Sequence, residues 1–249
     1  GRWAGRAVQL QNLPRNKMKL LNLARELVKA NDYDSLFMMF TNVSKVLSEL
    51  IRTTLIAKEG HTFVIADYSA IEGRITAWLA GEKWREQVFA GKGNLYEISA
   101  AKIFNAPIEQ VTIGSEYRDK GKIAELALGF GGSVGAYRQM AGDDITETDA
   151  QIKAIIDKWR KESPEIVKMW YAFERCAIRA IKTRSAVTSP HKGIIFNYEH
   201  NCLTIKLPSG RKLIYRNASL TTNRWGNPSI KYMGVNPDTK RWGWVDTYG

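Results

Sequence analysis

The sequence predicts an α+β fold that is mostly helical, with a few strands gathered near its end. Two observations support this class. Apolar residues recur at helical spacing in segments between Lys17 and Thr183. After Thr183 the pattern changes to short β-prone runs separated by Gly, Asn and Pro. We therefore expect a large helical part followed by a small sheet.

The first part of the chain is expected to contain a loop, two helices and one strand. Gly and Pro without a sustained period predict a loop up to Arg15. Helical spacing covers Lys17–Ala30 and then about Tyr33–Leu50, with Asp32 in the N-cap position. The β-favouring run Thr62–Ala66 predicts a buried strand.

The rest of the chain is expected to contain further helices and a hairpin. Helical patterns cover about 70–80, 94–104, 116–141, 147–160 and 164–183. The β-prone run Leu203–Leu207, the turn Pro208–Gly210 and the run Lys212–Tyr215 predict the hairpin.

The charge balance favours a polyanionic partner. Lys and Arg number 37 against 25 Asp and Glu, a net charge of +12. Such an excess supplies the sequence-independent part of nucleic-acid binding. On charge alone, a nucleic-acid-binding protein and an unrelated basic enzyme are equally open. No apolar run reaches the roughly 18 residues of a membrane helix, so no membrane partner is expected.

The start of the chain and its two cysteines bear on the length of the whole protein and on its cellular location. The chain begins GRWAGRAVQL, without Met or a leader, so we expect an internal part of a longer protein. Cys176 and Cys202 fit no metal spacing, which predicts reduced thiols in a cytoplasmic protein.

One acid follows the expected strand directly. Asp67 stands where the strand turns into a helix, and a carboxylate fixed there can bind Mg²⁺ together with substrate phosphates. The Tyr68 N–H and neighbouring carbonyls are close enough to share the ion or the phosphates. The alternative is an ordinary helix N-cap, a position that Asp often occupies.

A second candidate site is a helical stripe with residues four apart. Arg118 and Lys122 make its first half cationic, and Leu126 and Phe130 make its second half apolar. This face suits a nucleoside triphosphate, with phosphates at the cations and base and sugar at the apolar residues. The alternative is a solvated basic turn that leads into a core stripe.

The segment DYSAIEGR, from Asp67 to Arg74, resembles motif A of the family A DNA polymerases. The resemblance implies that Asp67 is one of two metal-binding aspartates. It also implies that Glu72 faces the sugar of the incoming nucleotide and excludes a ribose 2′-OH. Arg74 would brace the site through an ion pair or have a structural role.

The basic helix is similar to motif B of the same family, at Arg118, Lys122, Phe130 and Gly131. Phe130 stands at the family's tyrosine position. Leu126 departs from the usual aromatic residue, which bears on base stacking and not on the phosphates. The segment ELALGFGG resembles the corresponding sequence of phage-type members of this family.

Flanking segments extend the resemblance. Gly1–Arg2 and LQNLP are similar to the stretch that holds the primer–template, so Arg2, Gln11 and Asn12 are expected to contact DNA. Arg52 is expected near the triphosphate. Tyr96 replaces a phosphate-facing histidine and can still donate a hydrogen bond.

Basic and aromatic residues also alternate in the C-terminal part, which suits sugar-phosphate contact and stacking as well as a solvated hairpin. These residues are Lys206, Arg211, Lys212, Tyr215, Arg216, Arg224 and Trp225.

The resemblance implies a domain order. We expect the start of a palm over 1–80 with a helical insertion at about 17–48, helical fingers over 81–185, and a β-rich return toward the palm over 186–249. The family's last palm motif, H-D-E, is not found in the sequence. The chain alone is therefore expected to have little or no polymerase activity, with the second metal ligand supplied by a further segment or a separate polypeptide. Robust Asp67-dependent primer extension would contradict this expectation.

The function expected of the intact enzyme is template-directed transfer of a nucleotide from dNTP to a primer 3′-OH, with two Mg²⁺ ions and primer–template DNA. It would act in a bacterial cell or a phage-infected host. One alternative is a single-subunit RNA polymerase, which Glu72 disfavours because an RNA-making site must accept the 2′-OH. The other is a non-catalytic DNA-binding module.

Overall fold

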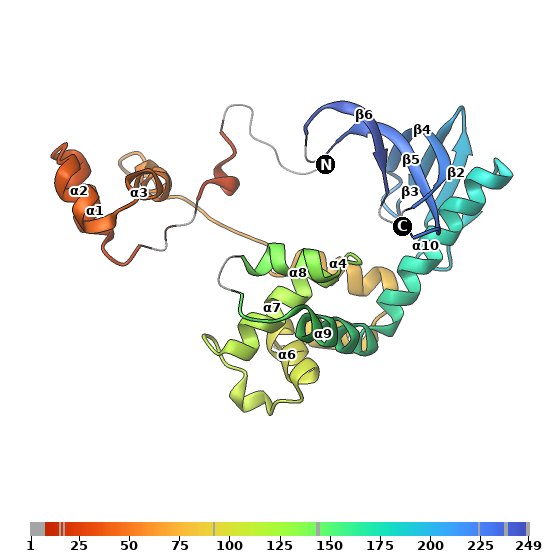
Figure 1. Cartoon of the computed structure of the whole chain (residues 1–249), viewed down its shortest axis with the longest axis horizontal. Helices are drawn as coiled ribbons and strands as arrows, with labels where there is room; N and C mark the ends of the chain where they lie inside the picture. Colours follow the sequence, from red (N-terminus) through yellow and green to blue (C-terminus); the bar gives the residue numbers. More distant parts are fainter. Residues whose placement is uncertain are drawn as a thin grey trace. The chain divides into compact units, whose positions relative to one another are not determined.

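The structure is a computed structural model that describes residues 8–14, 16, 18–91, 93–142, 145–223, 225–236 and 239–247. The chain forms two compact units, Gly1–Asp67 and Tyr68–Gly249. Helices and one antiparallel sheet confirm the α+β class (Figure 1).

The described part of the first unit contains a small helical core. Ala24, Leu36, Val46 and Leu50 are buried against one another. The elements are η1 (Leu10–Asn12), α1 (Leu21–Lys29), α2 (Tyr33–Phe40), α3 (Val43–Leu50) and η2 (Ile51–Thr54).

The predicted helix over Tyr33–Leu50 is in fact two helices. The N-cap prediction is confirmed, because the Asp32 carboxylate accepts a hydrogen bond from the Ser35 N–H at 3.0 Å. Thr41 takes a positive φ of 56° and ends α2. The Asn42 side chain then accepts from the Lys45 N–H at 2.9 Å and caps α3. Local capping therefore divides a continuous apolar pattern.

The strand predicted over Thr62–Ala66 is wrong. This segment is extended but pairs with no strand in the described part of the chain, and Val64 and Ile65 are each 91% exposed. A strand satisfies its backbone groups through a neighbouring strand. All described strands lie between residues 187 and 246 and pair among themselves.

The helical part of the second unit confirms most of the expected helices. The element Lys83–Ala90 was not expected. These helices are α4 (Ile71–Ala80), α5 (Lys83–Ala90), α6 (Leu95–Phe104), η3 (Ile108–Gln110), α7 (Glu116–Leu128), α8 (Val134–Ala141), α9 (Asp149–Glu162) and α10 (Pro164–Thr183).

The helix predicted over 116–141 is interrupted by its glycines. α7 ends at Leu128, and Gly131 takes a φ of +83° that favours glycine. A Cβ at Gly132 would lie 2.1 Å from the Ala127 carbonyl oxygen. The tight run Gly129–Gly132 therefore turns the chain before α8 begins.

The sheet is an antiparallel meander in chain order. The predicted hairpin is confirmed as two of its strands, joined by a turn in which the Gly210 N–H donates to the Leu207 carbonyl at 2.9 Å. The strands are β1 (Val187–Thr188), β2 (Ile195–Glu199), β3 (Cys202–Lys206), β4 (Lys212–Thr222), β5 (Pro228–Val235) and β6 (Trp242–Asp246).

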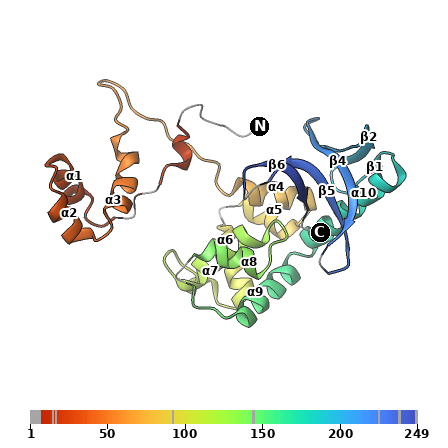
Figure 2. The ribbon, with the colours of Figure 1, turned by 45° about the horizontal axis from the view of Figure 1, so that its top comes forward.

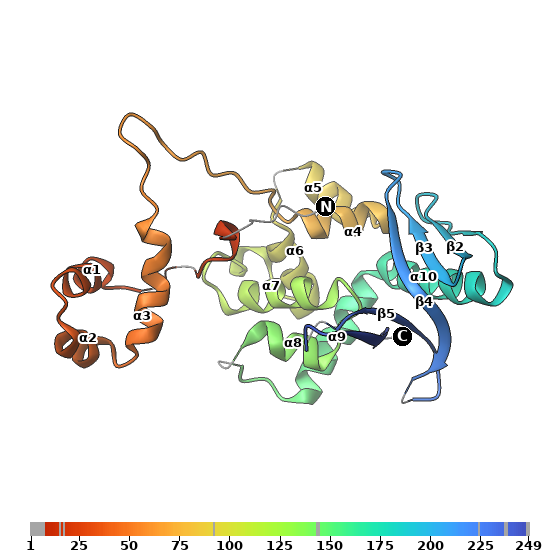
Figure 3. The same ribbon diagram turned by 90° about the horizontal axis from the view of Figure 1, so that it is seen from above.

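Helix α10 joins the two cores of the second unit. One core lies among the helices around Trp159, and the other lies where Cys176 and Ala177 of α10 meet Phe196 and Leu203 of the sheet. Figures 2 and 3 show the sheet lying against α10. Both cysteines, Cys176 and Cys202, are free thiols.

Candidate nucleotide and DNA site

Asp67 lies in an exposed, extended segment. The helix that follows has Ala70 as its N-cap, at a positive φ of 50° and without a side-chain cap, so Asp67 does not have the capping role. Within the described residues, no group of three or more His, Cys, Asp or Glu side chains could hold a metal ion.

Arg74 braces the start of α4. Its Nε donates to the Ser69 carbonyl at 2.9 Å and its Nη1 donates to the Phe89 carbonyl at 3.2 Å. Its guanidinium also lies 4.5 Å from the centre of the Phe89 ring. These contacts tie the loop before α4 to the end of α5.

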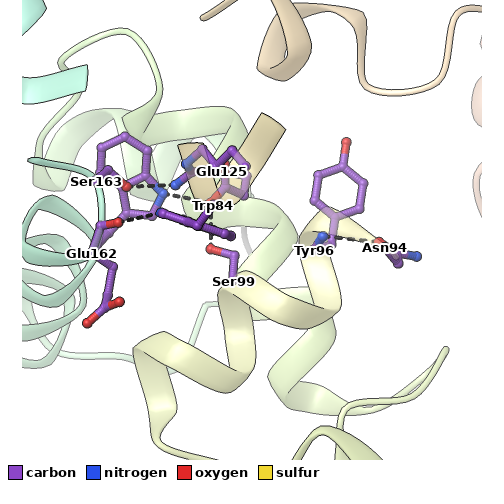
Figure 4. Close-up of polar contacts among 9 residues, drawn as sticks. Trp84, Asn94, Tyr96, Ser99, Glu125, Glu162 and Ser163 are labelled. Atoms are coloured by element: carbon purple, nitrogen blue, oxygen red, sulfur yellow. Dashed lines mark hydrogen bonds and ion pairs between the residues drawn. The ribbon is translucent and has the colours of Figure 1, made fainter. Parts of the chain in front are cut away.

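Tyr96 stands in the first turn of α6. The Asn94 side chain accepts from the Tyr96 N–H at 3.0 Å, as Figure 4 shows. Burial raises the pKa of the Tyr96 phenol, the nearby charge of Glu125 raises it further, Arg118 opposes the shift, and Glu72 adds to it. The phenol therefore stays protonated near neutral pH and can donate a hydrogen bond.

The two cations of α7 that are predicted to bind phosphate differ in their surroundings. Arg118 is mostly buried, and its Nε lies 3.3 Å from Glu97 Oε1 on α6. Lys122 is exposed and makes no ion pair with any described residue. Arg118 is thus held in place, whereas Lys122 can reach a ligand from solvent.

The predicted four-residue stripe is only partly correct. Leu126 is half-buried on α7, but Phe130 lies beyond the end of the helix and is 67% exposed. Phe130 instead borders a cavity of about 660 Å³ whose lining includes Trp170, Tyr215 and Ile230. The turn at Gly129–Gly132 therefore moves the aromatic residue from the helix toward α10 and the sheet.

A buried ion pair fixes α7, and the motif analysis did not detect it. Glu125 pairs with Arg85 of α5, and both residues are less than 10% exposed. Ser99 Oγ donates to Glu125 Oε1 at 2.5 Å, and Trp159 Nε1 donates to the same oxygen at 2.9 Å. Arg85 also donates to Ser163 Oγ at 2.7 Å. Figure 4 shows this cluster between α6, α7 and α9.

Close backbone packing adds to this network. A Cβ at Gly121 would lie 2.5 Å from Ala100 Cβ and 2.8 Å from the Tyr96 carbonyl oxygen. α6 and α7 can therefore approach closely only because residue 121 is glycine. The sequence does carry a signal for the ion pair of Glu125. This acid lies inside the apolar run 123–128, and a buried charge needs partners.

Some side chains of the first unit that are expected to contact DNA or the triphosphate form hydrogen bonds within that unit. Asn12 Nδ2 donates to Gln9 Oε1 at 2.9 Å. Arg52 donates to the backbone carbonyls of Leu10 and Leu13, so it ties η2 to the segment around η1. Gln11 lies on η1, and Arg2 lies outside the described residues.

Among the predicted site residues, the second unit groups one set. The charges of Arg118 on α7 and Glu72 on α4 both act on the pKa of the Tyr96 phenol on α6. The first unit contains Asp67, Arg52, Gln11 and Asn12, and Tyr68 begins the second.

No described helix combines the length and apolar character needed to cross a membrane.

Comparisons with known proteins agree with the motifs. A family model for DNA polymerase family A matches residues 1–192. A DNA polymerase of Bacillus phage SP02 is 44% identical over the whole chain, which covers 38% of that protein. A thermostable DNA polymerase I of Thermus filiformis is 28% identical over 46% of the chain and 14% of its own length.

A DNA polymerase I of Pseudomonas aeruginosa is 30% identical over 41% of the chain and 11% of its own length. The chain thus spans well under half the length of the curated relatives that it matches.

Proposed function

We propose, since the chain belongs to the family A DNA polymerases, that it carries part of a site for template-directed transfer of a deoxynucleotide to a primer 3′-OH. The observation that carries this proposal is the fixed cationic face of α7. Arg118 is held by Glu97, and the helix is anchored by the buried Glu125. Phosphoryl transfer depends mainly on positioning and charge stabilisation, which such a face supplies.

Each residue near this face has a proposed role. Arg118 and Lys122 bind the triphosphate, and the protonated Tyr96 phenol donates a hydrogen bond to it. Glu72 occupies the space that a ribose 2′-OH would need. Leu126 and Phe130 contact the sugar and base, with Phe130 acting from the turn after the helix.

The residues present fit Mg²⁺ in part. This ion usually takes one or two protein carboxylates together with water and substrate phosphates. Asp67, with the Tyr68 backbone beside it, would supply one carboxylate. When bound, the ions would polarise the primer hydroxyl and neutralise phosphate charge. The second carboxylate would come from a further segment of the protein or from a separate polypeptide.

We also propose the remaining assignments of the domains and partners. Residues 1–80 would begin the palm, 81–185 would form the fingers, and 186–249 would return toward the palm. Arg2, Gln11 and Asn12 would contact primer–template DNA, and Arg52 would support the triphosphate site. The substrates place this activity in the cytoplasm of a bacterial cell or phage-infected host.

A nucleotide-binding experiment tests this proposal. The chain with Mg²⁺ is titrated with a fluorescent dATP analogue, and unlabelled dATP and ATP compete for binding. Replacing Lys122 by Ala should weaken the binding of both nucleotides by about tenfold or more, because a hydrogen bond to a charged group contributes about 1.5–3 kcal/mol. Glu72→Ala should instead narrow the preference for dATP over ATP.

Lys158→Ala, at an exposed lysine of α9, is the matched control and should change neither affinity. Unchanged nucleotide affinity in Lys122→Ala would contradict the phosphate role. A strong preference for ATP in the unmodified chain would favour the RNA polymerase alternative.

A further inference from the structure

The outer face of the sheet carries exposed aromatic and basic side chains. The inner face packs on α10 through residues such as Phe196, Leu203 and Ile230. Side chains alternate between the faces of a strand, so the cross-strand partners of the remaining positions share the opposite face. Those positions include Lys206, Lys212, Ile214, Arg216, Lys231, Met233, Val235, Trp242 and Trp244.

Two tryptophans form the aromatic part of this face. Trp242 lies opposite Val235 and is 61% exposed, and Trp244 lies opposite Met233 and is 56% exposed. The Lys231 ammonium lies 5.3 Å from the centre of the Trp244 ring. Two largely exposed rings are therefore presented, and a positive charge lies over one of them.

The basic part of the face lies on β3 and β4. Lys206 and Lys212 are direct cross-strand partners, an arrangement of like charges that destabilises a sheet unless an anion lies between them. Within the described residues, Lys206, Lys212 and Arg216 form no ion pair with an acid. The acids on the face are Glu199 at the end of β2 and Asp246 opposite Lys231. The cationic edge therefore suits a polyanion.

The two parts are continuous across the strands. Arg216 lies opposite Met233, and Met233 lies opposite Trp244. Neighbouring strands are about 4.8 Å apart, so this row spans about 10 Å. A chain of phosphates at the cations can therefore place its bases on the tryptophans.

We propose that this outer face binds single-stranded DNA. Phosphates contact Lys206, Lys212 and Arg216, and bases stack on Trp242 and Trp244. Stacking requires unpaired bases with open faces, so a duplex cannot use the tryptophans. This site is separate from the nucleotide face of α7 and requires neither Asp67 nor a bound nucleotide. Tyr215, which the sequence pattern grouped with these residues, lies on the inner face.

The test measures binding of a fluorescent oligo(dT) to the full chain by anisotropy. The double variant Trp242→Ala/Trp244→Ala should bind about tenfold more weakly or worse, whereas Trp242→Phe/Trp244→Phe should retain most of the affinity. Tyr33→Ala, at an exposed aromatic residue of α2, is the control and should bind as the unmodified chain does.

A salt titration tests the cations. Lys206→Ala/Lys212→Ala should lower the slope of log affinity against log salt by about 0.7 for each phosphate that the variant no longer neutralises. Lys153→Ala/Lys158→Ala on α9 is the charge-matched control and should leave the slope unchanged. Circular dichroism checks that each variant stays folded.

Two results would overturn the proposal. The first is unchanged oligo(dT) affinity in the tryptophan double variant. The second is an equal loss of affinity for duplex DNA in that variant. Asp67→Ala and Lys122→Ala should leave oligo(dT) binding unchanged, so failure of the nucleotide site would be distinguishable from failure of this one.

Discussion

The helix α7 and the segment Thr62–Asp67 each carry candidate site residues, and the two are built in different ways. α7 is capped by Ser115, packed closely on α6 at Gly121 and anchored by the buried pair of Glu125 and Arg85. The segment before Asp67 is extended and exposed, and it pairs with no strand in the described part of the chain.

This difference shows which of the two segments is held in place by contacts within the chain. Several independent contacts hold α7 and its Arg118 side chain in place before any ligand binds, whereas the exposed Lys122 makes no ion pair with any described residue. The carboxylate of Asp67 has no comparable support, because an isolated extended segment cannot satisfy its backbone groups internally.

The largest expected effect comes from removing the acid that anchors α7. Glu125→Ala leaves Arg85 buried without its partner, so we expect a loss of about 3–5 kcal/mol in the free energy of unfolding. Urea denaturation measures this loss. Glu109→Ala, at an exposed acid on η3, is the control and should change the stability by less than about 0.5 kcal/mol. A loss of under about 1 kcal/mol in Glu125→Ala would mean that α7 is held by other contacts.

A methyl group at the end of α7 should have the next largest effect. Gly132→Ala places a Cβ against the Ala127 carbonyl, so the turn must shift, at a cost of about 1–3 kcal/mol. Gly135→Ala is the matched control, because nothing lies within 4 Å of its Cβ position. Equal stability of both variants in thermal unfolding would show that the turn adapts freely.

Glu82, a buried acid at the N-cap of α5, predicts that the stability depends on pH. Burial raises the pKa of Glu82, although backbone N–H groups of Glu165 and Ile166 and the charge of Arg85 oppose the shift. A raised folded pKa means that the stability is full below the ordinary value of about 4.3 and falls as pH rises through the folded pKa. Glu82→Gln should remove this fall, so the two stability curves should diverge with rising pH. Parallel curves from about pH 4 to 7 would contradict the shift.

The smallest effect is expected in the extended segment. Val64→Thr and Ile65→Thr change side chains that are exposed, so the free energy of unfolding should change by less than about 0.5 kcal/mol. Val46→Ala, in the buried core of the first unit, is the comparison and should cost clearly more. A loss above about 1 kcal/mol at Val64 would show that this segment packs within the folded chain.

Local patterns predicted much of the fold. Helical spacing located α6, α9 and α10, and turn chemistry located the hairpin of β3 and β4. The strand at Thr62–Ala66 could not be judged from its own residues, because a strand depends on a partner elsewhere in the chain.

The candidate site was predictable only where its residues form a local motif. Arg118, Lys122 and Tyr96 are recognisable in that way, and the charges of Arg118 and Glu72 do act on the pKa of Tyr96. The network around Glu125 joins residues up to 78 positions apart, so no local pattern contains it. The position of Phe130 depended on where the glycines end the helix.

Native-state hydrogen exchange tests the contrast between α7 and the segment before Asp67 most directly. The amides of the last two turns of α7, over 121–128, should exchange only through large-scale unfolding, because they are hydrogen-bonded inside a buried cluster. The amides of Phe63, Val64 and Ile65 should exchange at nearly the rate of an unstructured peptide. Strong protection at residues 63–65, or weak protection along 121–128, would contradict the view that contacts within this chain order α7 and leave the segment before Asp67 exposed.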